Sequence, residues 1–291
     1  MSSEQPKSPI HLALPKGRMM AGVVSLLAEA GIQVNTDRRG YRPVLSVPGF
    51  ETKLLKPQNI LEMLSRGSRD LGFAGADWVA ELGLDLVELM DTKLDPVRIV
   101  AAAPASLLED GELPKRPLVV ATEYLGLAAE WVKARGIDAR LVRTYGATEV
   151  FPPEDADIIL DNSATGQTLV ANGLVIIDDV IRSSTRLYTC AAVLENEEKR
   201  ERIERFVLLM RSVLDARQRV MIDVNVSAEC LEDVIRVLPC MREPTISNLH
   251  GQSGFAVKAA VQRDALPELL PLLKANGGMD IAVSALVQIV Q

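Results

Sequence analysis

The chain has 291 residues, of which 48% are hydrophobic and 24% are charged, and its formal net charge is -7. This length suggests two or three domains with substantial cores, and the composition excludes a disordered chain or a fibre. The acidic balance disfavours proteins that coat nucleic acid or lie on a membrane surface, because both need a basic face. It does not exclude a locally positive site for an anionic substrate.

Metal-ligating and nucleophilic side chains are few. Cys190, Cys230 and Cys240 have no C-x-x-C spacing, and the only histidines are His11 and His250. We therefore expect buried free thiols rather than a disulfide framework, a zinc site or a Ser-His-Asp triad.

Nothing in the sequence suggests export or a membrane span. Residues 1–10 lack the basic-then-apolar layout of a signal peptide, and the most apolar stretch, 99–108, is interrupted by Pro104. We expect a cytoplasmic protein that does not enter a membrane.

Short apolar runs alternate with amphipathic segments as far as residue 217, which predicts α/β architecture. Before residue 92 we expect strands at 11–14, 44–47 and 70–75 and helices at 19–30 and 60–64. Beyond it we expect strands at 97–103, 118–121, 139–142, 158–160 and 175–177. A helix with Thr122 as its N-cap should end at Gly136, and 197–217 should form one long helix.

The order changes after residue 218. We expect strands at 220–226, 245–249, 255–261 and 281–283, and helices at 231–238 and 266–275. This βαββαβ order over about 70 residues is the split-βαβ, ferredoxin-like plan. A module this small, without catalytic-looking residues, indicates a regulatory or assembly domain.

The most informative stretch runs from Asp157 to Leu169. An apolar strand ends at Asp161, and a small polar loop with two threonine hydroxyls leads into a helix, an arrangement that presents amides to an anion. Asp161 is placed to accept from ribose hydroxyls or to hold hydrated magnesium. The alternative is an ordinary strand–turn–helix capped by Thr165. Neither a Walker loop nor G-x-G-x-x-G occurs; the layout is instead similar to the loop by which phosphoribosyltransferases hold phosphoribosyl pyrophosphate.

Two further segments are candidates for ligand contacts. Lys16, Gly17 and Arg18 follow the first strand, where open α/β sheets bind ligands, although basic residues there are commonly just solvated. The segment 73–78 ends a strand in small residues and an acid, although a tight turn with a helix cap explains it equally well.

Several motifs together carry a resemblance that covers nearly the whole chain. They are ALPKGR (13–18), GFAGADW (72–78), VATEY (120–124), GATEV (146–150), DNSATGQTLVANGL (161–174), SSTRL (183–187), KRERIE (199–204) and EPTISNL (243–249). In these motifs the chain resembles the ATP phosphoribosyltransferase family, in the long form that carries a regulatory domain.

The resemblance implies a fold and a domain layout. It implies two lobes like those of type II periplasmic binding proteins, followed by a ferredoxin-like domain that binds histidine as a feedback inhibitor. We expect lobe I to comprise 1–92 with 188–217, lobe II 93–187, and the regulatory domain 218–291. Family members use Mg²⁺ and form homo-oligomers, a dimer or a hexamer; the sequence does not identify the metal ligands.

The resemblance also implies roles for individual residues. Asp161 would face the ribose of phosphoribosyl pyrophosphate. Its 5′-phosphate would lie against the loop formed by Ser163, Ala164, Thr165, Gly166, Gln167, Thr168 and Leu169. The predicted catalytic residues are Lys16, Arg18 and Glu149. Nucleotide or pyrophosphate contacts are predicted for Gly17, Lys56, Gly75 and Asp77, and histidine contacts for Asp223, Met241 and Thr245.

The chain departs from the family pattern in four places. Lys56 to Ile60 reads Lys-Pro-Gln-Asn-Ile where the family usually shows Arg-Pro-x-Asp-Ile, and 92–98 lacks the usual Gly/Phe-containing segment. Ala164 replaces a common Glu or Ser, and Glu243 replaces a small residue. Replacing Arg by Lys loses bidentate phosphate recognition.

The sequence therefore predicts transfer of a phosphoribosyl group to adenine N1 of ATP, with loss of pyrophosphate, as the first step of histidine biosynthesis. The alternatives are a phosphoribosyltransferase with a nucleobase acceptor and a non-enzymatic, two-lobed small-molecule sensor.

Overall fold

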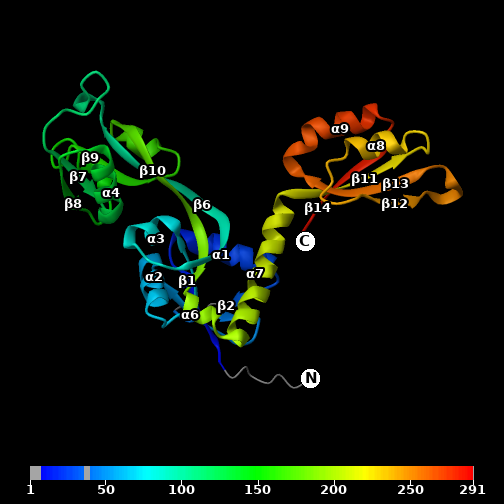
Figure 1. Cartoon of the computed structure of the whole chain (residues 1–291), viewed down its shortest axis with the longest axis horizontal. Coiled ribbons are helices and arrows are strands. Elements are labelled where there is room, and N and C mark those ends of the chain that lie inside the picture. The colour runs from blue at the N-terminus through cyan, green and yellow to red at the C-terminus, as the bar shows by residue number, and fades with distance from the viewer. Residues whose placement is uncertain (1–7, 36–39, 291) are drawn as a thin grey trace. The chain divides into compact units, whose positions relative to one another are not determined.

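The computed structural model describes residues 8–35 and 40–290, which group into two compact units. Unit 1 contains residues up to 25 together with 32–203, and unit 2 contains 26–31 together with residues from 204 onward (Figure 1). Residues 1–7, where the sequence predicts no signal peptide, lie outside the described residues. No helix within the described ranges is long and apolar enough to cross a membrane.

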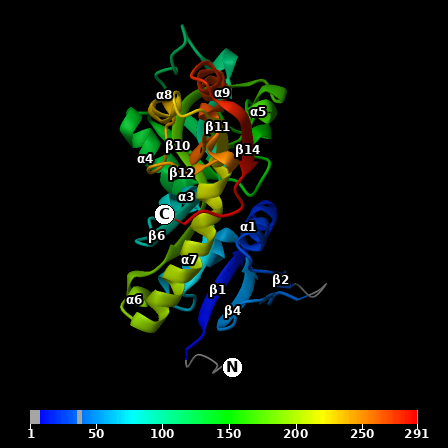
Figure 2. The ribbon, with the colours of Figure 1, turned by 90° about the vertical axis from the view of Figure 1, so that its right-hand side faces the viewer.

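The first half of unit 1 is built on three parallel strands. The strand β1 (Ile10–Pro15) lies between β4 (Phe50–Leu55) and β5 (Leu71–Gly75), and β1 and β4 run side by side in Figure 2. All of β5 is buried, as expected for a strand covered on both faces. The remaining elements are α1 (Arg18–Glu29), β2 (Val34–Asn35), β3 (Val44–Leu45), α2 (Pro57–Ser65) and α3 (Ala76–Leu82).

The second half of unit 1 repeats this plan. Here β7 (Leu118–Thr122) lies between β8 (Ala139–Arg143) and β9 (Ile158–Ser163), again parallel to both. The helix α4 (Leu125–Arg135) packs Trp131 against the core of these strands. Shorter elements complete this half: η1 (Ala105–Leu107), η2 (Thr148–Val150) and α5 (Gln167–Ala171).

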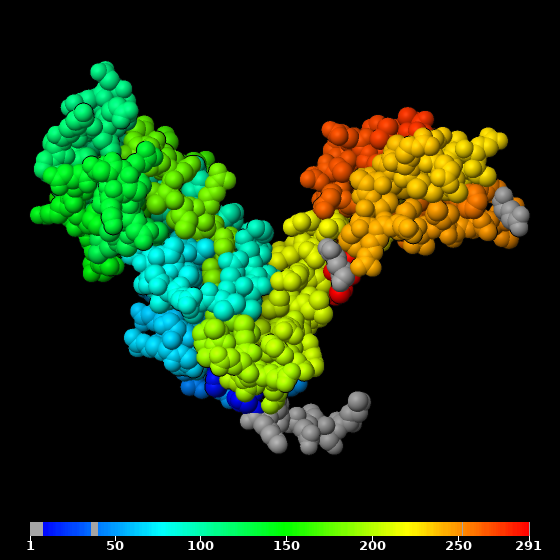
Figure 3. All heavy atoms as spheres, viewed as in Figure 1, coloured from blue at the N-terminus to red at the C-terminus, as the bar shows by residue number. Residues whose placement is uncertain are grey.

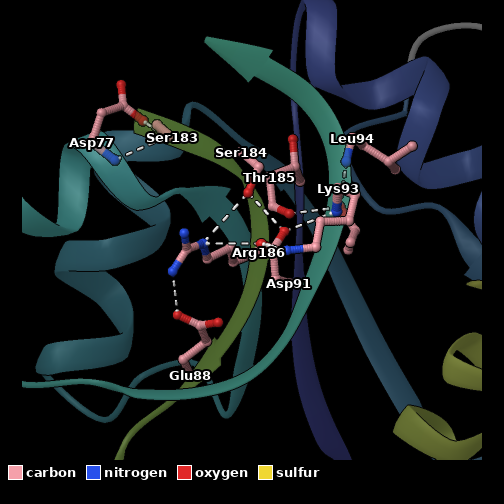
Figure 4. Close-up of polar contacts among 10 residues, drawn as sticks. Asp77, Glu88, Asp91, Lys93, Leu94, Ser183, Ser184, Thr185 and Arg186 are labelled. Atoms are coloured by element: carbon pink, nitrogen blue, oxygen red, sulfur yellow. Dashed lines mark hydrogen bonds and ion pairs between the residues drawn. The ribbon is translucent and has the colours of Figure 1, made fainter. Parts of the chain in front are cut away.

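Two long antiparallel strands join the halves into one sheet. They are β6 (Val87–Pro104) and β10 (Leu174–Thr189), and the sheet order is β4-β1-β5-β10-β6-β9-β7-β8. Their pairing slips at several points between Ser183 and Tyr188. Side-chain bonds supplement the ladder there: Asp91 accepts from Ser184 at 2.7 Å and from the Lys93 ammonium at 2.7 Å (Figure 4). The irregular stretch is therefore cross-linked by side chains between the two strands.

The C-terminal module folds in the order that the sequence predicts. After α6 (Ala191–Leu194) and α7 (Glu197–Arg217), its elements are β11 (Arg219–Val226), α8 (Leu231–Val237), β12 (Thr245–Asn248), η3 (His250–Gln252), β13 (Phe255–Gln262), η4 (Arg263–Ala265), α9 (Leu266–Ala275) and β14 (Met279–Ala285). The sheet order is β12-β13-β11-β14, antiparallel throughout. Alternate residues of β11 are buried with Val234 of α8 and Leu269 of α9, so the helices cover one face. This βαββαβ module, coloured orange to red in Figure 3, confirms the expected element order.

Several predicted elements need correction. The predicted strand 97–103 is the end of an 18-residue strand, and 175–177 is the start of a 16-residue one. Their other portions mix charged and apolar residues, which hides them from a search for apolar runs. The strand Phe50–Leu55 was missed for the same reason, whereas the predicted strand 44–47 is only Val44–Leu45.

Thr122 is not the N-cap of α4. It ends β7, where its hydroxyl donates to the Leu160 carbonyl at 2.6 Å and accepts from the Tyr124 amide at 2.8 Å. The helix starts three residues later, at Leu125. Thr122 therefore stabilises the turn between strand and helix.

Candidate functional site

The predicted phosphate loop, residues 161–169, spans the end of β9, at Ser163, and the start of α5, at Gln167. Gly166 has φ +78°, a conformation that glycine adopts without a Cβ penalty. Leu169 is buried and anchors the loop, whereas the side chains of Thr165 and Thr168 are exposed. Two hydroxyl donors are therefore available to a ligand, as the sequence predicts.

A cavity of about 230 Å³ brings the loop together with residues from elsewhere in unit 1. Arg18, the first residue of α1, reaches it from the first half, and Glu149 reaches it from η2. Its lining is Arg18, Glu149, Asp161, Asn162, Ser163, Ala164, Thr165, Gly166, Thr168 and Leu169. A guanidinium and two carboxylates thus share one small polar cavity with the loop.

Asp161 has an unusual electrostatic environment. Burial raises the pKa of its carboxyl to about 6, and the negative charges of Glu123 and Glu149 add to this shift. Hydrogen bonds from the Asn162 amide, at 2.7 Å, and from Thr148 oppose it. Ionising this carboxyl therefore costs free energy, and a bound hydrogen-bond donor or cation would reduce that cost.

The two basic residues that follow β1, Lys16 and Arg18, lie in different surroundings. Gly17 has φ +81°, and this turn separates Lys16 from Arg18. The Lys16 ammonium lies 3.7 Å from the centroid of the Tyr41 ring, and no described carboxylate forms an ion pair with it. An aromatic face holds a cation without neutralising it. The Lys16 ammonium is therefore held by an aromatic ring rather than by a carboxylate of the described residues.

The other predicted nucleotide contacts, Lys56, Gly75 and Asp77, do not line this cavity. Lys56 is exposed and precedes α2. Gly75 and Asp77 are buried, and Asp77 accepts hydrogen bonds from Ser183 at 2.6 Å and from Tyr124 at 2.9 Å. A Cβ on Gly75 would lie 2.1 Å from an Asp77 carboxylate oxygen, so glycine lets that side chain fold back.

The predicted histidine contacts lie on the C-terminal module. Asp223 and Thr245 both pair in register with Lys258 of β13, and Asp223 forms an ion pair with Lys258 at 3.1 Å. Met241 donates its amide to Ala260, next but one along β13. Neighbours in register share a face of the sheet, so Asp223, Lys258 and Thr245 form a row of polar groups.

Sequence reasoning did not select three residues that the structure connects to the site. Asn162 lines the cavity, Tyr124 bonds to Asp77, and Tyr41 packs on Lys16. Asn162 and Tyr124 were inside quoted motifs, so a search for side-chain donors there would have found them. Tyr41 carried no signal, because its partner is 25 residues away.

A second cavity, of about 560 Å³, lies elsewhere in the second half of unit 1, beside Trp131, Arg135 and Asp178. It is larger than the loop cavity. Two of its charged groups, Asp178 and Arg135, are paired: Asp178 accepts from Trp131 and from Arg135, each at 2.8 Å. The loop cavity is the candidate functional site because the predicted site residues Arg18, Glu149 and Asp161 line it.

The fold is that of an α/β protein with a small polar cavity at a strand end, beside an arginine from the neighbouring half of the sheet. The sequence profile described as ATP phosphoribosyltransferase matches residues 56–212, and that described as the C-terminal domain of the same family matches 216–288. An ATP phosphoribosyltransferase of Chlorobium phaeobacteroides is 31% identical over 277 residues, 94% of each chain. One of Pelotomaculum thermopropionicum is 30% identical over 97% of this chain and 99% of its own.

The solved ATP phosphoribosyl transferase (HisG:HisZ) complex from Thermotoga maritima includes a chain with a related fold. It matches with a TM-score of 0.63 at 23% identity, over 71% of this chain and 98% of that one. The chain belongs to the ATP phosphoribosyltransferase family, whose members are glycosyltransferase-type enzymes of histidine biosynthesis.

Proposed function

We propose that this protein transfers the phosphoribosyl group of phosphoribosyl pyrophosphate to adenine N1 of ATP and releases pyrophosphate. The observation that carries the proposal is the cavity in which Arg18 meets the phosphate loop and Asp161. Family membership supplies the two substrates, and the exposed threonine hydroxyls and the guanidinium suit their phosphates.

Different residues of the loop bind the 5′-phosphate and the ribose of phosphoribosyl pyrophosphate. The 5′-phosphate lies against the segment from Ser163 to Leu169, with Ala164 and Gln167 contributing backbone amides and Thr165 and Thr168 contributing hydroxyls. Asp161 accepts from the ribose hydroxyls. Glu149 lies at the same cavity, and its carboxylate is a second acceptor for the sugar or its bound cation.

The pyrophosphate and the ATP phosphates bind to the basic residues that follow β1 and precede α2. Arg18 bonds to the leaving pyrophosphate, and Lys16 and Lys56 contribute charge to it or to the ATP phosphates. Gly17 lets the backbone approach them. Gly75 and Asp77 stay predicted nucleotide contacts, although both Asp77 oxygens already accept bonds within the protein.

The chemistry needs little acid–base help. Adenine N1 carries a lone pair and attacks the anomeric carbon without losing a proton, while the bond from that carbon to pyrophosphate breaks. The protein's contribution is to hold two polyanions in line and to stabilise the departing charge with Arg18, Lys16 and loop amides. This accounts for a site without a catalytic histidine or cysteine.

The cavity suits a magnesium ion that would bind mainly to the phosphate oxygens of the substrate. Within the described residues there is no cluster of three or more His, Cys, Asp or Glu side chains suited to a metal. Mg²⁺ commonly binds through one or two carboxylates together with substrate phosphates and waters. Asp161 and Glu149 provide those carboxylates, and the ion would neutralise charge on the pyrophosphate.

The direct test is to mix the full-length protein with ATP, phosphoribosyl pyrophosphate and Mg²⁺ and to follow the ultraviolet absorbance of the adenine adduct. We expect adduct and pyrophosphate in equal amounts. Product from a free nucleobase instead of ATP would support a different phosphoribosyltransferase. Binding of either substrate without any product would support a sensor.

Tyr41 should hold Lys16 in position for this reaction. Replacing Tyr41 by Leu removes the ring face, and we expect kcat/KM to fall about three- to fivefold, as for loss of an exposed cation–π contact. Tyr41→Phe keeps the ring and should stay within twofold of the wild type. Initial rates under limiting phosphoribosyl pyrophosphate measure this. Equal losses in the Leu and Phe variants would contradict a role for the ring.

We further propose that the two halves of unit 1 are lobes like those of type II periplasmic binding proteins. The support is that the chain crosses from one half to the other in β6 and returns in β10. The proposed boundaries are 1–92 with 188–217 for lobe I, 93–187 for lobe II and 218–291 for a ferredoxin-like regulatory domain.

Histidine is the proposed inhibitor of the enzyme. A free amino acid carries a carboxylate and an ammonium group, which Lys258 and Asp223 would pair with, and Met241 and Thr245 flank them. A homo-oligomer, a dimer or a hexamer, and a cytoplasmic location complete the proposal. Adding histidine to the assay above tests the inhibition, and light scattering tests the assembly.

A further inference from the structure

The position of Arg18 depends on the helix that carries it. Arg18 lines the loop cavity, and no carboxylate among the residues that the structure describes forms an ion pair with it. It is the first residue of α1, so its guanidinium lies where the start of that helix places it. Arg18 and Gly22 are four residues apart and stand on the same face of α1. Whatever packs against Gly22 therefore also affects Arg18.

A turn within β6, residues 92–95, packs against this face of α1; we call it the crossover turn. A Cβ on Gly22 would lie 3.4 Å from Cδ1 of Leu94 and 3.8 Å from a carboxylate oxygen of Asp95, so the helix and the turn are in contact. Figure 4 shows the Leu94 side chain directed toward α1, the blue helix. The crossover turn therefore supports the first turns of α1.

The backbone of the crossover turn is unusual for the residues that form it. Lys93 has φ +59° and Asp95 has φ +46°, left-handed conformations that glycine adopts without strain. The turn lies within 92–98, where the chain lacks the Gly/Phe-containing segment that its family usually shows. Side chains bond to both strained residues: the Lys93 amide donates to Asp91 at 2.8 Å, and the Asp95 carboxylate accepts from the Thr185 hydroxyl at 2.9 Å. Such conformations persist where the surrounding contacts fix them.

Thr185 of β10 bonds to both ends of the crossover turn. Its hydroxyl donates to Asp95, and its carbonyl accepts from the Thr92 hydroxyl at 2.6 Å. The Thr92 hydroxyl oxygen also accepts from the Leu94 amide at 3.2 Å. Thr92 and Thr185 are each 1% exposed, so water does not compete for the bond between them. The turn is therefore fixed to β10 while it contacts α1.

We infer that Thr185 and Asp95 are positioning residues, which hold the crossover turn against Gly22 and thereby place Arg18 at the phosphate loop. The inference rests on the proposed function, because it takes the pyrophosphate of phosphoribosyl pyrophosphate as the ligand of Arg18. Neither residue lines the loop cavity. Both act through α1, and a displacement of that helix by about 1 Å would weaken the contact between Arg18 and the ligand.

Thr185→Val tests this role, because it removes the hydroxyl and keeps the shape of the side chain. We expect the dissociation constant of phosphoribosyl pyrophosphate to rise about three- to tenfold, as for loss of a hydrogen bond. Thr185→Ser keeps the hydroxyl and should stay within about twofold of the wild type. Titration calorimetry on the full chain, with Mg²⁺ present, measures this constant on the folded protein without needing turnover.

Asp95→Gly removes the same hydrogen bond from the other side. Asp95 is only partly buried, and glycine adopts its backbone conformation without strain, so this variant is safer for folding. It should raise the dissociation constant as Thr185→Val does. Adding Thr185→Val to Asp95→Gly should have no further effect, because both changes break one bond.

Thr189→Val is the matched control on the same strand. Thr189 is also buried, and its hydroxyl donates to the Asp70 carbonyl at 2.7 Å, but it pairs with Val87 rather than with the crossover turn. Unfolding in urea should show a loss of stability in both Thr→Val variants. Thr189→Val should nevertheless leave the dissociation constant within about twofold of the wild type.

Arg18→Ala completes the test. It should raise the dissociation constant at least as much as Thr185→Val, and Thr185→Val should add nothing in its background, because the positioned group is already gone. Additive effects of these two changes, an unchanged constant in Thr185→Val, or an equal rise in Thr189→Val would overturn the inference. If the variants bind as expected but the wild type forms no adduct with ATP, the proposed reaction fails while the positioning role stands.

Discussion

Asp161→Asn should lose about a hundredfold in kcat/KM and yet gain stability. The carboxylate is proposed to accept two ribose hydroxyls, and each hydrogen bond to a charged acceptor contributes about 1.5 kcal/mol, so losing both costs about 3 kcal/mol. Steady-state rates with phosphoribosyl pyrophosphate as the varied substrate measure the loss. Wild-type kcat/KM should also fall as the pH drops below about 6, where Asp161 takes up a proton, and the variant should lack that part of the profile.

The stability gain follows from the direction of the pKa shift. The pKa of Asp161 is raised from 3.8 to about 6 in the folded protein, so ionising it disfavours the folded state. This penalty is absent below pH 3.8, grows as the pH rises toward 6 and is complete above it. At pH 8 the variant should be more stable by about 1–2 kcal/mol, after the altered hydrogen bonds are allowed for. At pH 4 the difference should vanish. Unfolding in urea at the two pH values measures both.

Asp157, one residue before the start of the same strand, provides the matched control. The Arg116 guanidinium, 2.6 Å away, lowers the pKa of the Asp157 carboxyl, which is the opposite shift. Asp157→Asn should therefore reduce stability at neutral pH and leave kcat/KM within about twofold. If both variants lost activity equally, the effect of Asp161→Asn would reflect damage to β9 rather than loss of a ribose contact.

Arg18→Ala should reduce kcat/KM by about ten- to thirtyfold. Arg18 lines the cavity from the first turn of α1, and loss of one charge-assisted contact to a phosphate costs about 2 kcal/mol. The loss should appear in kcat if the contact strengthens as pyrophosphate departs. Arg18→Lys keeps the positive charge but cannot form two parallel hydrogen bonds to a phosphate. Its kcat/KM should lie between those of the wild type and Arg18→Ala.

The control for Arg18 is Arg140→Ala. Arg140 is an exposed arginine on β8 that does not line the cavity. It should leave the kinetics within twofold. Unchanged rates in Arg18→Ala would remove that residue from the site.

The sequence was most informative where the site is one continuous segment. The loop from Asp161 to Leu169 could be predicted because its strand, turn and helix all follow local rules, and the C-terminal module could be predicted from its alternating apolar pattern. Arg18 was selected by its place after a strand, but its approach to the loop depends on how two halves of a sheet pack, which no local pattern encodes.

Other features were not predicted because they depend on contacts between residues that are far apart in the sequence. The Asp77–Tyr124 bond joins residues 47 positions apart, and its significance depends on burial. The long strands β6 and β10 carry charged residues that bond to each other across the pair, as Glu88 does to Arg186 at 2.6 Å. Such cross-strand pairs satisfy charges that look, along one segment, like those of a loop.

The pairing of β6 with β10 also bears on how the chain could be divided. Leu94 pairs with Thr185, so the chain leaves the first half and re-enters it at neighbouring points. The second half is therefore an insertion within the first half, and the two ends of the insertion are neighbours in the sheet. Circular permutation and domain grafting require ends that lie close together. A short turn in place of residues 95–184 would close the host sheet, and the excised segment would contain the whole of the predicted phosphate loop.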